Sequence, residues 1–174
     1  MFYMDVRRVI LVITSIAIYW YFNTYTFAYT FEDNAKTQIE NQILHKINRH
    51  RLNYHLAPLS LDHRLSASAR YKSIHMKENE YYSHTSPVHG EFYNIPYMFG
   101  HTGAVGEVIH GLSHECIDSI IYAWLNSPSH RELILHPDAR SAGVGIGVPY
   151  TPFIVALNGQ YYLISGLTTV HFGF

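Results

Sequence analysis

Two hydrophobic periodicities, found in different parts of the chain, constrain the fold more than any other feature of this sequence. Ile39, Ile43 and Ile47 recur every four residues, which is typical of the buried face of an amphipathic helix. Near the other end, residues 143–148 read Gly-Val-Gly-Ile-Gly-Val and alternate as strand residues do. Because helices come first and antiparallel strands come last, we expect an α+β fold with helices packed on a sheet.

Turn and capping signals divide the chain into expected elements. Capping boxes at residues 37–40 and 129–132 each predict a helix start. Helices are expected at residues 37–53, 61–79, 113–126 and 129–135, and strands at residues 143–148, 153–157 and 160–170. Asn158-Gly159 predicts a tight hairpin between the last two strands. Residues 81–106 show no period and are expected to form a long loop, of the kind that is usually functional.

The first 31 residues have the pattern of a targeting or anchoring segment, and one domain is expected after them. Arg7 and Arg8 precede an uncharged zone of 23 residues that ends before Glu32. A basic flank followed by an apolar core is typical of a secretory signal, and the zone is also long enough for a membrane-spanning helix. A signal cleaved near Ala28 and a retained signal-anchor both remain open. Either one predicts that the domain works outside the cytoplasm.

Charge and cysteine content exclude several classes of function and structure. The formal net charge is −1 and no run of like charges occurs, so nothing favours a nucleic-acid partner. Cys116 is the single cysteine, which excludes an intrachain disulfide. It falls on the apolar side of an expected helix, where we expect a buried, unreactive thiol.

Two histidines and one glutamate, each beside turn-forming residues, form the candidate site. They are His84 in Tyr-Ser-His-Thr-Ser, Glu107 in Gly-Glu-Val-Ile, and His130 in Pro-Ser-His-Arg. Imidazoles and a carboxylate can hold a divalent cation or transfer protons. His130 is expected in the first turn of a helix, where the helix dipole favours the neutral ring that a metal needs. Glu107 enters an apolar segment, so it must be paired, metal-bound or protonated.

Simpler structural interpretations of the same residues also remain open, and several other catalytic motifs are missing. The two histidines would then mark helix ends, and the glutamate would accept backbone hydrogen bonds. His114-Glu115 begins like the zinc protease motif HExxH, but the second histidine is missing. The glycines of residues 143–147 lack the GxGxxG spacing, and neither a GxSxG elbow nor a P-loop occurs.

Several segments occur in an order and spacing that are typical of one protein family. They are residues 46–51 with Pro58-Leu59, residues 65–69, Tyr82-Ser83-His84, residues 106–109, and residues 124–135 followed by Gly143-Val144-Gly145. In this order they resemble the CAP superfamily, which includes the SCP/PR-1, cysteine-rich secretory and antigen 5 proteins. The similarity is to its bacterial, disulfide-free branch and covers residues 36–174.

The resemblance implies a three-layer α-β-α sandwich with a central, mainly antiparallel sheet and a cleft that holds a polar tetrad. His84 and His130 match the family's two histidines, which can bind zinc, and Glu107 matches one of its two acidic residues. The second acid would fall near Asn126-Ser127, where this chain has no carboxylate. Cation binding and general-base chemistry are therefore expected to be weaker than in members with both acids.

Two functions are compatible with these observations. The first is a non-enzymatic, extracellular or cell-surface binding domain, secreted or anchored by an amino-terminal helix. Its cleft, formed by His84, Glu107 and His130, would take up zinc or another divalent cation, with a lipid or cell-envelope component as a further ligand. The alternative is a metal-dependent hydrolase of peptide or cell-wall bonds, with Glu107 as general base. The lack of a nucleophile and of a second placed acid favours the binding domain.

Overall fold

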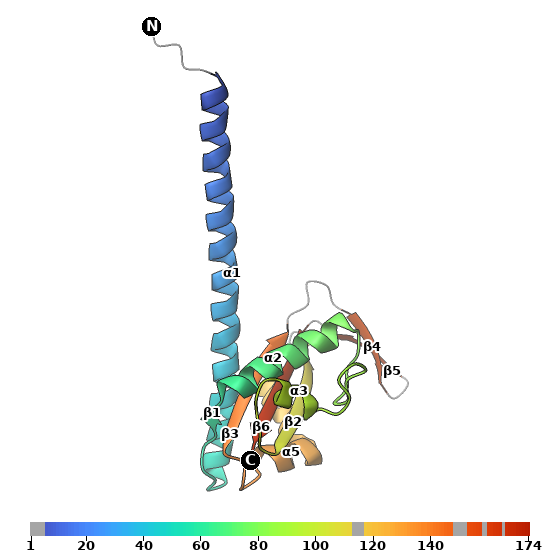
Figure 1. Cartoon of the computed structure of the whole chain (residues 1–174). Coiled ribbons are helices and arrows are strands. Elements are labelled where there is room, and N and C mark those ends of the chain that lie inside the picture. The colour runs from blue at the N-terminus through green and yellow to red at the C-terminus, as the bar shows by residue number, and fades with distance from the viewer. Residues whose placement is uncertain (1–5, 113–116, 148–152, 158–159, 165) are drawn as a thin grey trace. The chain divides into compact units, whose positions relative to one another are not determined.

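The computed structural model describes residues 6–112, 117–147, 153–157, 160–164 and 166–174 (Figure 1). The chain divides into two compact units, Met1–Gln38 and Ile39–Phe174. Helix α1, Val6–Asn53, contributes to both units, and all other elements belong to the second one. Among the described residues, we find no helix with the length and apolar character needed to cross a bilayer.

Helix α1 runs without interruption for 48 residues, so the expected helix start at Thr37 is wrong. Neither glycine nor proline occurs in this segment, and its residues are all compatible with a helix interior. Glu40, expected to cap the helix, instead accepts hydrogen bonds from the backbone N–H of Ile146 (3.1 Å) and from the Arg70 side chain (2.8 Å). The apparent capping box thus joins α1 to other parts of the domain.

The remaining helices are α2, α3, α4 and α5, with the following bounds: His63–Glu78, Asn94–Met98, Ile117–Asn126 and Pro128–Ile134. Helix α3 lies inside the expected long loop, and the expected start of α4 at residues 113–116, which include Cys116, lies outside the described residues. Helix α5 has Ser127 as its N-cap and Pro128 in its first turn, so the capping box predicted at Ser129 is wrong. Proline suits this position because its fixed φ is helical and the N–H it lacks would have had no intrahelical partner.

Within the described residues, six strands form a four-stranded central sheet and a separate pair. They are β1 (Ser60–Leu61), β2 (Val105–Leu112), β3 (Ser141–Gly147), β4 (Phe153–Leu157), β5 (Gln160–Ile164) and β6 (Gly166–Gly173). The central order is β1-β3-β6-β2, in which the short β1 pairs with β3 in parallel and the other pairs are antiparallel. The single strand predicted at residues 160–170 is wrong: β5 pairs with β4, whereas β6 lies in the central sheet.

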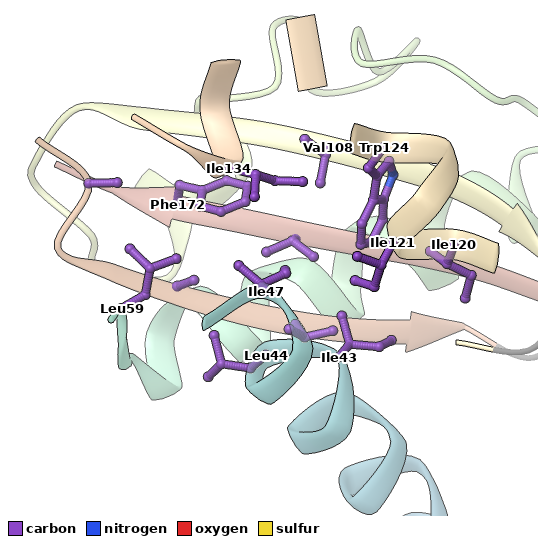
Figure 2. Close-up of a cluster of buried hydrophobic side chains, with 14 of the residues drawn as sticks. Ile43, Leu44, Ile47, Leu59, Val108, Ile120, Ile121, Trp124, Ile134 and Phe172 are labelled. Atoms are coloured by element: carbon purple, nitrogen blue, oxygen red, sulfur yellow. The ribbon is translucent and has the colours of Figure 1, made fainter. Parts of the chain in front are cut away.

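One face of the central sheet carries the main apolar core (Figure 2). Helices α1, α4 and α5 bury side chains there against β2, β3 and β6, among them Ile43, Ile47, Ile121, Trp124, Ile134, Val144 and Phe172. Of the three isoleucines that predicted an amphipathic helix, Ile43 and Ile47 are fully buried in this core, whereas Ile39 is 40% exposed.

The opposite face of the sheet is covered by α2, whose backbone lies directly against β3. Strand residues alternate between faces, so Val144 points into the main core while Gly143 and Gly145 face α2. A Cβ added to Gly145 would lie 1.9 Å from the backbone nitrogen of Arg70, and one on Gly143 would lie 2.0 Å from that of Ser66. Only glycine permits this approach. Helices on both faces confirm the predicted α+β, three-layer α-β-α architecture, with a mixed central sheet.

Candidate functional site

Glu107 lies in β2, an end strand of the four-stranded sheet, and points toward α2. Its side chain is fully buried and both oxygens accept hydrogen bonds from imidazoles. The Nδ1 of His84 lies 2.7 Å from Oε1, and the Nε2 of His171 lies 2.9 Å from Oε2. Burial alone would raise the pKa of Glu107, but the hydrogen bonds from His171 and His84 and the nearby Lys72 charge outweigh burial and lower it. The carboxylate is therefore ionised at neutral pH.

His171 is the cross-strand neighbour of Glu107 in the register between β6 and β2. Its side chain is fully buried, and its Nδ1 lies 2.7 Å from the hydroxyl of Ser68 in α2. The Ser68 hydroxyl also lies 2.9 Å from the carbonyl oxygen of Leu65. A continuous chain of hydrogen bonds thus runs from α2 through two strands to His84.

His84 belongs to the loop between α2 and β2, and two interactions hold it in place. The buried ammonium of Lys72 donates a hydrogen bond to the His84 carbonyl oxygen (2.8 Å) and lies 5.1 Å from the centre of the Tyr81 ring. Glu107 fixes the imidazole, as described above. Because the ionised carboxylate only accepts hydrogen bonds, Nδ1 of His84 carries the hydrogen and Nε2 has the free lone pair. The side chain is 44% exposed, so solvent reaches this ring.

His130 lies in the first turn of α5, as predicted, and its ring centroid is 6.0 Å from that of His84, with the rings inclined at 61°. Burial lowers the pKa of His130, and the neighbouring His84 and His110 lower it further. The neutral ring is thus favoured, with desolvation as the main cause.

The structure therefore brings His84 and Glu107 into hydrogen-bond contact and places His130 beside His84. Within the described part of the chain, no group of three or more histidine, cysteine, aspartate or glutamate residues has an arrangement that could hold a metal ion. Both oxygens of Glu107 already accept hydrogen bonds, so the donors left for a cation are the two imidazoles. Asn126, near which the resemblance predicts the family's second acid, is exposed and donates to the carbonyl oxygen of Tyr122.

Sequence reasoning missed His171, Ser68 and Lys72. The strand expected at residues 160–170 stopped one residue short of His171, although the alternation of β6 continues to Gly173. Helical periodicity did contain a signal for the other two, because a face that includes Leu65, Ala69 and Met76 also includes residues 68 and 72. A serine and a lysine on an apolar helix face indicate a buried polar partner opposite.

Comparisons with known proteins agree with this architecture. The chain is 36% identical over 107 residues to the uncharacterized protein YkwD of Bacillus subtilis, a match that covers 61% of this chain and 41% of the relative. It is 33% identical over 119 residues to the uncharacterized membrane protein YlbC of the same organism, a match that covers 66% of this chain and 33% of that relative. The chain thus spans well under half the length of these curated relatives.

Three solved bacterial structures illustrate the similarity of fold. An extracellular protein containing an SCP domain from Bacillus anthracis superposes with a TM-score of 0.65 at 24% identity, covering 79% of this chain and 41% of that one. An outer surface protein of Borrelia burgdorferi superposes with a TM-score of 0.62 at 19% identity, and the match covers 79% of this chain and 93% of that one. A cysteine-rich secretory protein of Staphylococcus aureus superposes with a TM-score of 0.56 at 13% identity, and the match covers 80% of this chain and 40% of that one.

The family model for the cysteine-rich secretory proteins, named CAP, matches residues 44–151. That segment includes His84, Glu107 and His130, and it is more than half of the chain. The predicted resemblance is confirmed: this chain belongs to the CAP, or cysteine-rich secretory protein, family.

Proposed function

We propose that this chain is an extracytoplasmic CAP-family binding domain in which His84 and His130 hold a divalent cation, with zinc as the best candidate. One observation supports this proposal above the others: Glu107 accepts the Nδ1 hydrogen of His84 at 2.7 Å, which leaves Nε2 as an exposed donor beside His130. Histidines that bind metals usually donate their other ring hydrogen to a carboxylate or carbonyl in this way.

The separation of the two rings is close to that required by one shared ion. Imidazole nitrogen binds zinc at about 2.0–2.1 Å with near-tetrahedral angles, so two rings on one ion have centroids about 5.2 Å apart. The observed 6.0 Å is wider by about 0.8 Å, so a small approach of the two rings would place both on one ion. A bound zinc ion would act there as a Lewis acid and template, with its remaining positions open to exogenous ligands.

The environment of Glu107 favours binding over hydrolysis. A general base needs an oxygen within hydrogen-bond reach of the water that it activates. The Glu107 side chain is fully buried, and its two oxygens accept hydrogen bonds from His84 and His171. Its lowered pKa also makes it a weak base at neutral pH. We therefore assign Glu107 the role of orienting His84.

The extracytoplasmic location rests on two independent observations. Similar structures belong to proteins described as an extracellular protein and an outer surface protein. The amino-terminal sequence has a basic flank followed by a long uncharged zone, as secreted or anchored proteins do.

Calorimetric titration of the purified chain with zinc tests the cation site. We expect one zinc per chain and at least about tenfold weaker binding in His84→Ala and in His130→Ala, because each variant removes one of two protein donors. His45→Ala, which changes an exposed histidine of α1, serves as the matched control and should bind as the wild type does. Undiminished binding by the double variant of His84 and His130 would refute the site.

A further inference from the structure

His171 is a buried imidazole that the proposed cation site does not use directly. Its side chain has no exposed surface, yet both of its nitrogens lie within hydrogen-bond distance of polar side chains. One partner is the Glu107 carboxylate on the neighbouring strand, and the other is the Ser68 hydroxyl on α2. A polar ring placed inside an apolar domain costs free energy unless it is fully hydrogen-bonded, so this arrangement calls for a functional account.

The tautomer of His84 depends on its contact with Glu107. A carboxylate only accepts, so Nδ1 of His84 donates to it at 2.7 Å and Nε2 of the neutral ring keeps its lone pair. Without this contact the hydrogen of the ring can lie on Nε2, where it would block a cation. Glu107 is fully buried, so its ionised form needs a donor for each oxygen. His171 is the donor to Oε2.

We propose that His171, held in place by Ser68, is a positioning residue that fixes the orientation of Glu107 and thereby keeps His84 in the tautomer with Nε2 free. The purpose of this arrangement rests on the proposed cation site, whereas the tautomer itself is a property of the metal-free protein.

The Ser68 hydroxyl holds the ring of His171 from the side of α2. Its oxygen lies 2.7 Å from Nδ1 of His171 and 2.9 Å from the carbonyl oxygen of Leu65. When the hydroxyl donates to Nδ1, the neutral ring carries its hydrogen on Nε2, which then donates to Glu107.

Nitrogen-15 NMR of the histidine rings in the metal-free, full-length protein at neutral pH tests the proposal directly. We expect the Nδ1–H tautomer of His84 in the wild type and in His171→Gln, whose amide can still donate to Glu107. In His171→Leu, which has no donor, Oε2 of Glu107 loses its partner and the carboxylate can turn away from His84, so part of the His84 hydrogen population should move to Nε2. His84→Ala provides the assignment of the signals. A wild-type ring with its hydrogen on Nε2 would overturn the proposal without any variant at position 171, so the test does not depend on that variant folding.

Zinc titration of the same variants separates this proposal from the proposed function. We expect zinc to bind His171→Leu about tenfold more weakly than the wild type, as is common when a group that orients a metal ligand is removed. His171→Gln should restore most of the affinity. Equal affinity and an unchanged His84 tautomer in folded His171→Leu would refute the positioning role while leaving the cation site intact. A wild type that binds no zinc but shows the expected tautomer would refute the cation site alone.

Discussion

Replacing Gly145 by alanine should destabilise the domain, because α2 lies against the backbone of β3. The new Cβ would lie 1.9 Å from the backbone nitrogen of Arg70 and 2.2 Å from the carbonyl carbon of Ala69. Ordinary van der Waals contact begins near 3.4 Å, so the helix would have to move by about 1.5 Å. Backbone cannot rotate away as a side chain can.

The expected cost follows from two opposing effects. Overpacking of a core costs about 1–3 kcal/mol, and a shift of a whole helix belongs at the upper end of that range. Alanine also restricts the unfolded chain, which returns about 0.4–1 kcal/mol. We therefore expect a net loss of about 2–2.6 kcal/mol in the free energy of unfolding, and a decrease of about 4–10 °C in melting temperature for a chain of this size.

Thermal unfolding followed by circular dichroism, together with urea denaturation, measures this loss. Gly106→Ala is the matched control, since it makes the same change in a strand of the same sheet. There the nearest atom, 2.7 Å away, is a terminal methyl carbon of Leu133, which can rotate. The unfolded-state effect is common to both variants, so their difference reports the contact with α2. Equal melting temperatures for the two variants would refute the close approach of α2 to β3.

Two further predictions concern buried polar groups. The fully buried Arg51 donates to the carbonyl oxygens of Ala57, Ile134, His136 and Ala139. Arg51→Lys keeps the charge but loses most of these hydrogen bonds, so urea denaturation should show a decrease of about 2–4 kcal/mol in the free energy of unfolding. An unchanged denaturation midpoint would contradict this role. Burial, followed by the nearby His89 and Lys72 charges, lowers the pKa of His75 in the folded protein. The neutral His75 ring therefore stabilises the fold above the ordinary histidine pKa of about 6.5, and this contribution is lost as the pH falls toward the lower pKa of the folded state. His75→Gln should show a shallower loss of stability on acidification, and pH profiles that coincide would count against this assignment.

The elements that were predicted correctly are those whose signals are local. The face of α2, the apolar side of α4 and the strands β3 and β4 each follow from spacing within a few residues. Among the elements that were misjudged, the single strand expected at residues 160–170 depends on distant partners, because β5 and β6 pair with different strands. Glu40 belongs to a capping-box sequence, but its contacts are to Arg70 and Ile146, and no local rule anticipates them.

The same distinction applies to the candidate site. His84, Glu107 and His130 were found because each stands beside turn residues in a recognisable segment. The pairing of Glu107 with His171 joins positions 64 residues apart and exists only because β6 lies between β3 and β2. That strand order cannot be derived from local pattern alone, since β5 directly precedes β6 in chain order and yet pairs with β4. The partner of the glutamate was therefore not accessible from periodicity.

Each segment that carries a site residue is held to the domain by a different buried polar contact. Lys72 binds the backbone of the His84 loop to α2, and Arg51 binds the end of α5, which follows His130, to the end of α1. Glu107 is held by the strand pairing of β2 with β6. None of these contacts involves a group that would touch the cation. It follows that weakening one of them should alter the separation of the two imidazoles, and hence cation affinity, even in a domain that remains folded.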